Sequence, residues 1–285
     1  MVLNPYIKDQ TRELNLFSEV AERFGVNHAL AEFAARVCYK STMNMGKSPT
    51  FLKKKIVDVN HMDVFEHHYA TVFFDEEVYP IDNKYVHSVS ENAINSITAS
   101  DRVLLTLGLN IKEYLPGVYG PAKERKNHLL WGETVENGQN VSLLAYEENG
   151  KRFTWLLEGI SIFTATQITR HRVGSFSQQS ARYVSLEKGG WNGIIPPAFN
   201  REQQEILQEA YKFAQEKYAE LKSLGAKNED ARSVFPVGFT TRMVVSFDNE
   251  GLDHFFDLRL PKAAQWEIRQ IAESMFYQVQ SIGKN

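Results

Sequence analysis

The sequence predicts a protein of the α+β class with more helix than strand, and three patterns predict it. Apolar residues recur at steps of three and four over 12–40 and 262–280, as they do on helices that bury one face. The segments 68–76 and 240–248 are rich in aromatic and β-branched residues, which are typical of strands. Residues 200–224 combine a polar composition with one apolar stripe, which indicates a long surface helix.

In the N-terminal half, the expected elements are a broken helical region, a strand and a further helix. The pattern over 12–40 is interrupted near Gly25, so two helices in series are expected. The strand at 68–76 is followed by a helical pattern over 84–109. From 117 to 150 the chain is mostly polar and repeatedly interrupted by glycine, which predicts a long loop or a surface insertion.

In the C-terminal half, the apolar segment 152–168 is expected to form a helix that ends at a cluster of arginines. Asn200, with Gln203 three positions later, matches the pattern of a capping box and marks the start of the long helix. A short helix is expected over 228–235, because Pro236 follows and cannot continue it.

Composition and charge exclude several classes of protein. The 285 residues include 43% hydrophobic and 24% charged residues, as ordinary globular proteins do. The formal net charge of −3 argues against a surface that binds nucleic acid, and no apolar run reaches the roughly 18 residues of a membrane helix. The single cysteine, Cys38, excludes an intramolecular disulfide and a zinc site built from cysteines. Because no apolar segment typical of a signal peptide opens the sequence, a cytoplasmic protein is expected.

Two adjacent histidines, His67 and His68, follow Glu66 and raise the question of a metal site. Adjacent residues on a strand point to opposite faces, so both histidines cannot serve one ion and no metal is expected. Cys38 lies within an apolar helical pattern, and it is expected to be a packed thiol rather than a nucleophile.

The densest cluster of chemically active side chains lies at 167–183. Guanidinium groups this close together repel one another unless an anion lies between them, and arginine suits phosphate and carboxylate. Serine and glutamine can bond phosphate oxygens and the edge of a base. The segment therefore predicts a site for a phosphorylated ligand that carries a base. The alternative is a basic turn that lies in solvent and forms ion pairs with acidic residues elsewhere in the chain. Its members are Arg170, His171, Arg172, Ser175, Ser177, Gln178, Gln179, Ser180, Arg182 and Tyr183.

The spacing within this cluster resembles the signature of the flavin-dependent thymidylate synthases. Arg170-His171-Arg172 is followed after seven residues by Ser180, and the string continues into Arg182 as it does in that family. A bare triplet would be a weak signal, but other parts of the chain also match in order. These further segments are 34–38, 61–67, 230–236 and 252–272.

The resemblance implies a fold and an assembly. The family fold is α/β with a mainly antiparallel sheet and flanking helices, here as a single domain over 1–285 with a large helical and loop insertion at about 78–150. That insertion would be a lid, an oligomer contact or a partner surface, or else a tolerated surface elaboration. The resemblance also implies a cytoplasmic homotetramer with active sites at subunit contacts. Neither nucleic acid nor membrane is expected as a partner, given the net charge and the lack of a long apolar run.

The chemistry that the resemblance implies is the reductive methylation of dUMP at C5, which gives dTMP. Methylenetetrahydrofolate would supply the carbon, and NADPH would supply the reducing equivalents through a bound FAD. Because the flavin supplies the redox chemistry, no cysteine nucleophile is required. Two alternatives remain open: a paralogue that modifies a pyrimidine nucleotide differently, for example by hydroxymethylation, and a non-catalytic nucleotide-binding protein.

The resemblance also assigns roles to residues at matching positions. The catalytic residues would be Arg259, whose positive charge would stabilise electron density pushed onto the uracil, and Ser180, which we expect to bind substrate rather than act as a nucleophile. The implied cofactor contacts are His61, Glu66, Arg170, His171, Arg172, Val173 and His254. The implied dUMP contacts are Gln167, Arg170, Gln178, Gln179, Ser180, Arg182, Arg232 and Arg259.

Asp248 and Glu250 depart from the family pattern, because short members often carry asparagine and arginine there, near the flavin. Two acids would repel the diphosphate of FAD unless the chain follows a different local path. Neither acid is therefore assigned to the site. Gln178 is a milder departure, since some members have glutamate at that position.

Overall fold

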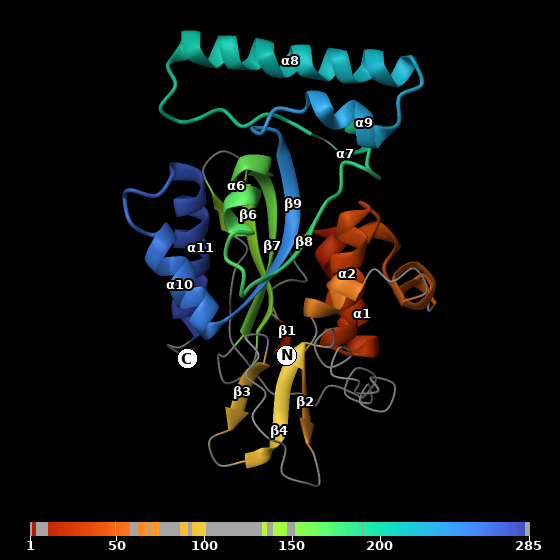
Figure 1. The fold of residues 1–285 in the computed structure, drawn as a ribbon, viewed down its shortest axis with the longest axis vertical. Helices are drawn as coiled ribbons and strands as arrows, with labels where there is room; N and C mark the ends of the chain where they lie inside the picture. The colour runs from red at the N-terminus through yellow and green to blue at the C-terminus, as the bar shows by residue number, and fades with distance from the viewer. Residues whose placement is uncertain are drawn as a thin grey trace.

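Two antiparallel sheets, with helices packed around the larger of them, make up the described part of the fold (Figure 1). The mixture of helices and antiparallel strands that the sequence predicts is confirmed. No helix among the described residues is long and apolar enough to span a membrane. The computed structural model describes residues 2–3, 11–48, 50–57, 62–67, 69–73, 86–90, 93–100, 133–135, 139–146, 152–189 and 191–282.

The larger sheet has six strands, and every neighbouring pair is antiparallel. The strands lie in the order β1 (Val2–Leu3), β6 (Gln139–Tyr146), β7 (Arg152–Ser161), β9 (Thr240–Asp248) and β8 (Ser175–Gln178), and β5 (Glu133–Val135) pairs with β6. β7 pairs with β9 along its whole length, so these two strands form the middle of the sheet. The strand expected at 240–248 is thus confirmed.

Helices cover both faces of this sheet (Figure 1). Side chains alternate between the faces along each strand. Trp155 belongs to the buried cluster that includes α10 and α11, and its neighbour Leu156 belongs to the opposite cluster, formed with α1 and α2. The core is therefore divided into two apolar layers by the sheet. The four helices are α1 (Arg12–Phe24), α2 (Val26–Cys38), α10 (Asn249–Arg259) and α11 (Trp266–Ile282).

The smaller sheet corrects one prediction and confirms another. Its three antiparallel strands lie in the order β2 (Tyr69–Phe73), β4 (Ala93–Ser100) and β3 (Val86–Ser90). β2 confirms the strand expected at 68–76, whereas the helix expected over 84–109 is wrong for the residues that β3 and β4 cover. These strands are rich in serine and β-branched residues, which are weak helix formers, and the pairing of β4 with β2 and with β3 satisfies their backbone.

The helix expected over 152–168 is also wrong in its first ten residues, which form β7. Only Ile162–Ile168 are helical, as α6. β7 is buried on both faces, and a strand of this kind reads as a continuous apolar run rather than as an alternation. The loop expected over 117–150 is likewise wrong for the residues that form β6. β6 is almost wholly buried in the sheet, so this end of the segment belongs to the core.

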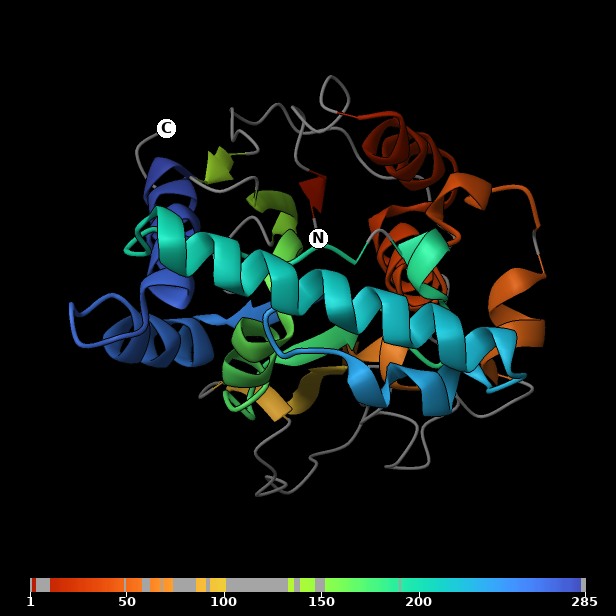
Figure 2. The same ribbon diagram turned by 90° about the horizontal axis from the view of Figure 1, so that it is seen from above.

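The remaining expected helices are confirmed. Gly25, at φ +92°, separates α1 from α2, as the break in the pattern predicts. The long helix α8 (Arg201–Ser223) begins at Asn200 with both hydrogen bonds of the predicted capping box. Figure 2 shows α8 lying across the end of the molecule, above the sheet. The short helix α9 (Asn228–Ala231) continues as a 3-10 turn through Val234, as expected before Pro236.

Candidate functional site

The arginine-rich segment forms the turn that joins α6 to β8. The amides of Arg170 and His171 still bond to carbonyls of α6, so the turn continues the end of that helix. A Cβ atom at Gly174 would lie 2.6 Å from the ring of Phe247 and 2.5 Å from that of Phe176, so only glycine lets the chain pass there. This close packing holds the turn against Phe176 and Phe247.

His171 and Arg259 meet beneath this turn, although 88 positions separate them in the sequence. The Nε of Arg259, in the last turn of α10, donates to Nε2 of His171 at 2.9 Å. Burial, and then the positive charge of Arg259 and the neighbouring His254, lower the pKa of His171 to about 4. His171 is therefore neutral near pH 7, and its proton lies on Nδ1 because Nε2 accepts from Arg259.

Aromatic rings and charges complete the surroundings of this pair. The ring of His171 contacts Phe255 at 4.9 Å and His254 at 5.7 Å between centroids. Desolvation, and then the charge of Arg170, lower the pKa of the Arg259 guanidinium, which nevertheless stays protonated. The structure thus brings together four residues predicted from widely separated segments, namely Arg170, His171, His254 and Arg259.

The next predicted residues, Gln178, Gln179 and Ser180, lie at the end of β8 and just after it. Gln178 donates to the hydroxyl of Thr241 at 3.4 Å. The amide of Gln179 bonds to the carbonyl of Arg242 at 2.9 Å, and the amide of Ser180 bonds to the carbonyl of Cys38 at 2.9 Å. β9, through Arg242, and the end of α2, through Cys38, therefore hold the backbone of Gln179 and Ser180 in place.

Arg182 and Arg232 are brought together by one acid, Glu229. The guanidinium of Arg182 donates to the Glu229 carboxylate at 3.2 Å, and Nε of Arg232 donates to the Glu229 carbonyl at 3.2 Å. Both arginines are exposed, and Arg182 also lies over the ring of Tyr183 at 5.4 Å. They form a second group of cationic side chains, which meet at Glu229.

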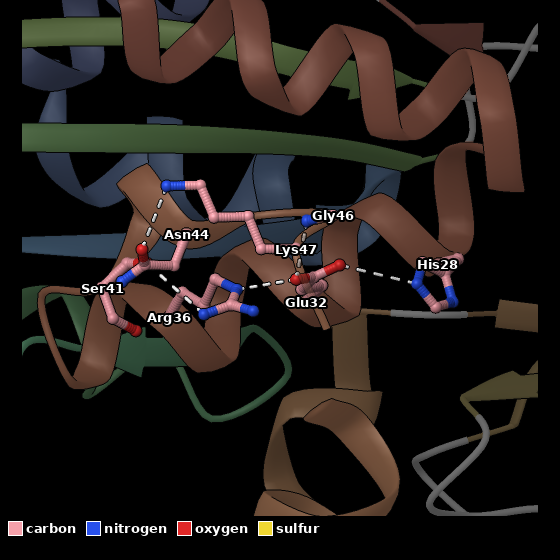
Figure 3. Close-up of polar contacts among 7 residues, drawn as sticks. All are labelled: His28, Glu32, Arg36, Ser41, Asn44, Gly46 and Lys47. Atoms are coloured by element: carbon pink, nitrogen blue, oxygen red, sulfur yellow. Dashed lines mark hydrogen bonds and ion pairs between the residues drawn. The ribbon is translucent and has the colours of Figure 1, made fainter. Parts of the chain in front are cut away.

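A buried ion-pair cluster anchors the end of α2 that supports Ser180 (Figure 3). The Glu32 carboxylate accepts from Nε of Arg36 at 2.7 Å and from the amide of Gly46 at 3.1 Å, and His28 lies 3.6 Å away. Burial alone would raise the pKa of Glu32, but its bonds to His28 and Arg36 outweigh burial and lower it. Arg36 also donates to the carbonyl of Ser41, so the cluster ties the following loop to the helix.

Cys38, at the end of α2, behaves as the packed thiol that the sequence predicts. Burial raises the pKa of Cys38 to about 12, so no thiolate is present near neutral pH. Its carbonyl accepts from the amide of Ser180, and its side chain also bonds to Ser177.

The short 3-10 helix η4 (Met62–His67) places Glu66 near β8. Nη2 of Arg152 donates to the carbonyl of Glu66 at 3.1 Å and to the hydroxyl of Ser175 at 3.4 Å. Sequence reasoning missed Arg152, and the signal that could have found it is a charged residue at the start of an apolar run. His61 lies outside the described residues. Among the residues that are described, no group of three or more His, Cys, Asp and Glu could hold a metal ion.

Asp248, which departs from the family pattern, has a structural role. Its carboxylate accepts from the amide of Gly251 at 2.7 Å and caps the N-terminus of α10. The sequence did not predict α10, so the reason for this acid was missed. Glu250 lies in the first turn of the same helix, where a negative charge is favourable.

The buried neutral histidines predict a loss of stability in acid. Burial, and then the charge of Arg152, lower the pKa of His67 to about 3, and an unfolded histidine titrates near 6.5. As the pH falls from about 6.5 to about 4, the unfolded chain takes up a proton that folded His67 does not. The free energy of unfolding should therefore fall by about 3 kcal/mol from His67.

Urea unfolding at pH 7.5, 6.5, 5.5 and 4.5 measures this dependence. In His67→Gln the decrease on acidification should be smaller, because glutamine does not titrate. Equal pH dependence in the wild type and in His67→Gln would contradict the assignment of a low pKa to this residue.

Comparisons with known proteins agree with the resemblance read from the sequence. The family model described as thymidylate synthase complementing protein matches residues 149–282. The flavin-dependent thymidylate synthase of Sulfurisphaera tokodaii is 40% identical over 130 residues, which are 46% of this chain and 51% of that protein. The enzyme of the same name from Haloarcula marismortui is 34% identical over 184 residues, which are 55% of this chain and 72% of that protein.

This chain spans about half the length of the first of these relatives and of the similar proteins from Saccharolobus solfataricus and Sulfolobus acidocaldarius. Among solved structures, thymidylate synthase X from Helicobacter pylori with FAD and dUMP is 20% identical, at a TM-score of 0.38. That match covers 45% of this chain and 66% of the other.

Proposed function

Because this chain belongs to the family of flavin-dependent thymidylate synthases, we propose that it methylates dUMP to dTMP. Methylenetetrahydrofolate is the carbon donor, and NADPH is the reductant through FAD. The observation that carries the proposal is the His171–Arg259 pair, which joins the arginine-rich turn to the end of α10. It places a protonated guanidinium against a neutral imidazole in a partly desolvated position, where charge acts strongly on a bound base.

The residues present fit a flavin. The side-chain nitrogen Nδ1 of His171 is buried and has no hydrogen-bond partner among the described residues. Buried donors of this kind are rare in folded proteins unless a ligand or a water satisfies them. Bound FAD would supply the redox chemistry. The residues that would hold it are His61, Glu66, Arg170, His171, Arg172, Val173 and His254.

The chain's own residues bind and polarise the nucleotide. The exposed guanidinium groups of Arg182 and Arg232 supply the charge for the phosphate, and the Ser180 hydroxyl adds a hydrogen bond. Gln178 and Gln179 offer amide groups for the uracil edge. Arg259 keeps its positive charge next to neutral His171, so it can stabilise electron density on the base without giving up a proton.

The active enzyme in this proposal is a cytoplasmic homotetramer with active sites at subunit contacts. The assembly follows from the family resemblance alone.

The experiment is a visible absorbance spectrum of the purified protein, before and after dUMP, methylenetetrahydrofolate and NADPH are added in one cuvette. A yellow protein that bleaches with NADPH and forms dTMP, measured by chromatography, is the expected result. A yellow protein that forms another product would favour the paralogue that modifies the nucleotide differently. A protein that binds dUMP but remains colourless with added FAD would overturn the proposal in favour of a non-catalytic nucleotide-binding protein.

A further inference from the structure

A chain of hydrogen bonds runs through the sheet next to the site, with His67 at its centre. The His67 side chain is completely buried. Its Nδ1 lies 2.9 Å from the hydroxyl of Ser246, and its Nε2 lies 3.0 Å from the hydroxyl of Ser177. The Ser246 hydroxyl in turn lies 2.7 Å from that of Thr154. One imidazole therefore joins η4 to β8 and β9, and through Ser246 to β7.

A neutral imidazole satisfies this chain of bonds. A neutral ring has one donor and one acceptor nitrogen, and a hydroxyl can act in either role. The four groups can therefore be ordered so that each donates to the next. An apolar side chain of the same size would fill the space but would leave the buried hydroxyls of Ser177 and Ser246 without this partner, which is costly in a dry interior.

Two consecutive residues of η4 are held to the same face of β8. The His67 side chain bonds to Ser177, and the Glu66 carbonyl is joined to Ser175 through Arg152. Ser175 and Ser177 are two positions apart on a strand and point to the same face. Because two separate bridges act at one junction, η4 cannot slide along β8 without breaking both.

This junction lies between the two groups of residues that the proposed function uses. Glu66 is a cofactor residue at the end of η4, and Gln178 and Ser180 are substrate residues at the end of β8. We propose that His67 is a positioning residue that holds Glu66 and the segment 178–180 at a fixed separation, through its bond to Ser177. The proposal rests on the proposed function for the identity of the two ligands, FAD and dUMP.

The test compares Ser177→Ala with Ser246→Ala. Each variant removes one hydroxyl that bonds to His67 and to one further side chain, which is Cys38 for Ser177 and Thr154 for Ser246. Only Ser177 lies on the strand that leads to the substrate residues. The dissociation constants for FAD and dUMP, measured by fluorescence titration and calorimetry, should each rise about tenfold in Ser177→Ala. In Ser246→Ala they should stay within about twofold of the wild type, although both variants lose stability. His67→Phe should resemble Ser177→Ala, and His67→Gln should recover part of the affinity.

Equal affinities in Ser177→Ala and Ser246→Ala would overturn the proposal, because a merely structural role affects both alike. Amide hydrogen exchange gives a readout that needs no ligand. Exchange at 178–182 should be faster in Ser177→Ala than in Ser246→Ala, and equal exchange would also count against positioning. If the wild type binds neither FAD nor dUMP, the proposed function fails, and the exchange measurement still decides whether His67 holds this segment.

Discussion

Replacing Arg259 with alanine is expected to slow dTMP formation by about 100-fold or more while the fold remains intact. The guanidinium is fixed before the substrate arrives by its bond to His171, so it needs no reorganisation during the reaction. Removing one such preorganised group costs on the order of 100- to 1,000-fold in turnover. The side chain is only partly buried at the end of α10, so its loss should lower the melting temperature by a few degrees at most.

Two further variants make this test specific. Arg259→Lys keeps a positive charge but lacks the Nε donor to His171, so it should recover only part of the rate. Arg269→Ala removes an arginine of α11 that bonds to the carbonyl of Lys262, and it should leave the rate unchanged. Steady-state rates with dUMP as the varied substrate measure all three. Wild-type turnover in Arg259→Ala would remove this residue from the chemistry.

The sequence predicts elements well where one face of a helix meets the core. α1, α2 and α8 follow from apolar periodicity, a glycine break and a capping box, and all of these signals are local. β7 was predicted as a helix because it is covered on both faces, which removes the alternation that marks a strand. β3 and β4 pair with each other, and β4 also pairs with β2, and this pairing overrides the helical spacing of the apolar residues in the segment.

The candidate site is likewise predictable from the sequence only in part. The turn and β8 place neighbouring residues such as Arg170 and His171 together, and the spacing of the signature is enough to predict them. The bond between His171 and Arg259 depends on α10 packing against the sheet, and α10 begins at an acid that the sequence reading treated as a departure. The bonds of His67 likewise depend on three strands meeting at one point, which sequence spacing does not contain.

The second large effect concerns Glu267, whose replacement by alanine should lower the free energy of unfolding by about 3–5 kcal/mol. This side chain is 2% exposed and lies in the first turn of α11. Its carboxylate accepts from the amide and the hydroxyl of Ser161, at 2.7 and 2.6 Å, and from the side-chain nitrogen of Gln139 at 2.7 Å. Alanine would leave these three buried donors without their acceptor, and each unmet donor costs about 1–3 kcal/mol.

Urea unfolding of Glu267→Ala, Glu267→Gln and Glu273→Ala separates this acceptor role from charge and helix propensity. Glu273 is a more exposed residue of the same helix, so its replacement should change stability by no more than about 0.5 kcal/mol. Glu267→Gln keeps one acceptor oxygen but turns an NH₂ group toward a donor. Its decrease in the free energy of unfolding should therefore lie between those of Glu267→Ala and Glu273→Ala. A loss in Glu267→Ala as small as in Glu273→Ala would mean that the three bonds do not stabilise the fold.

The position of Ser161 connects this stability to the site. Ser161 ends β7 and caps α6, and α6 carries Gln167 and leads into the arginine-rich turn. Glu267 therefore holds the start of the helix whose other end presents the ligand residues. If Glu267→Gln folds but binds FAD more weakly than Glu273→Ala does, the cap also sets the position of the turn. If the two variants bind FAD equally, the carboxylate acts on stability alone, and the packing around Gly174 must be what fixes the turn.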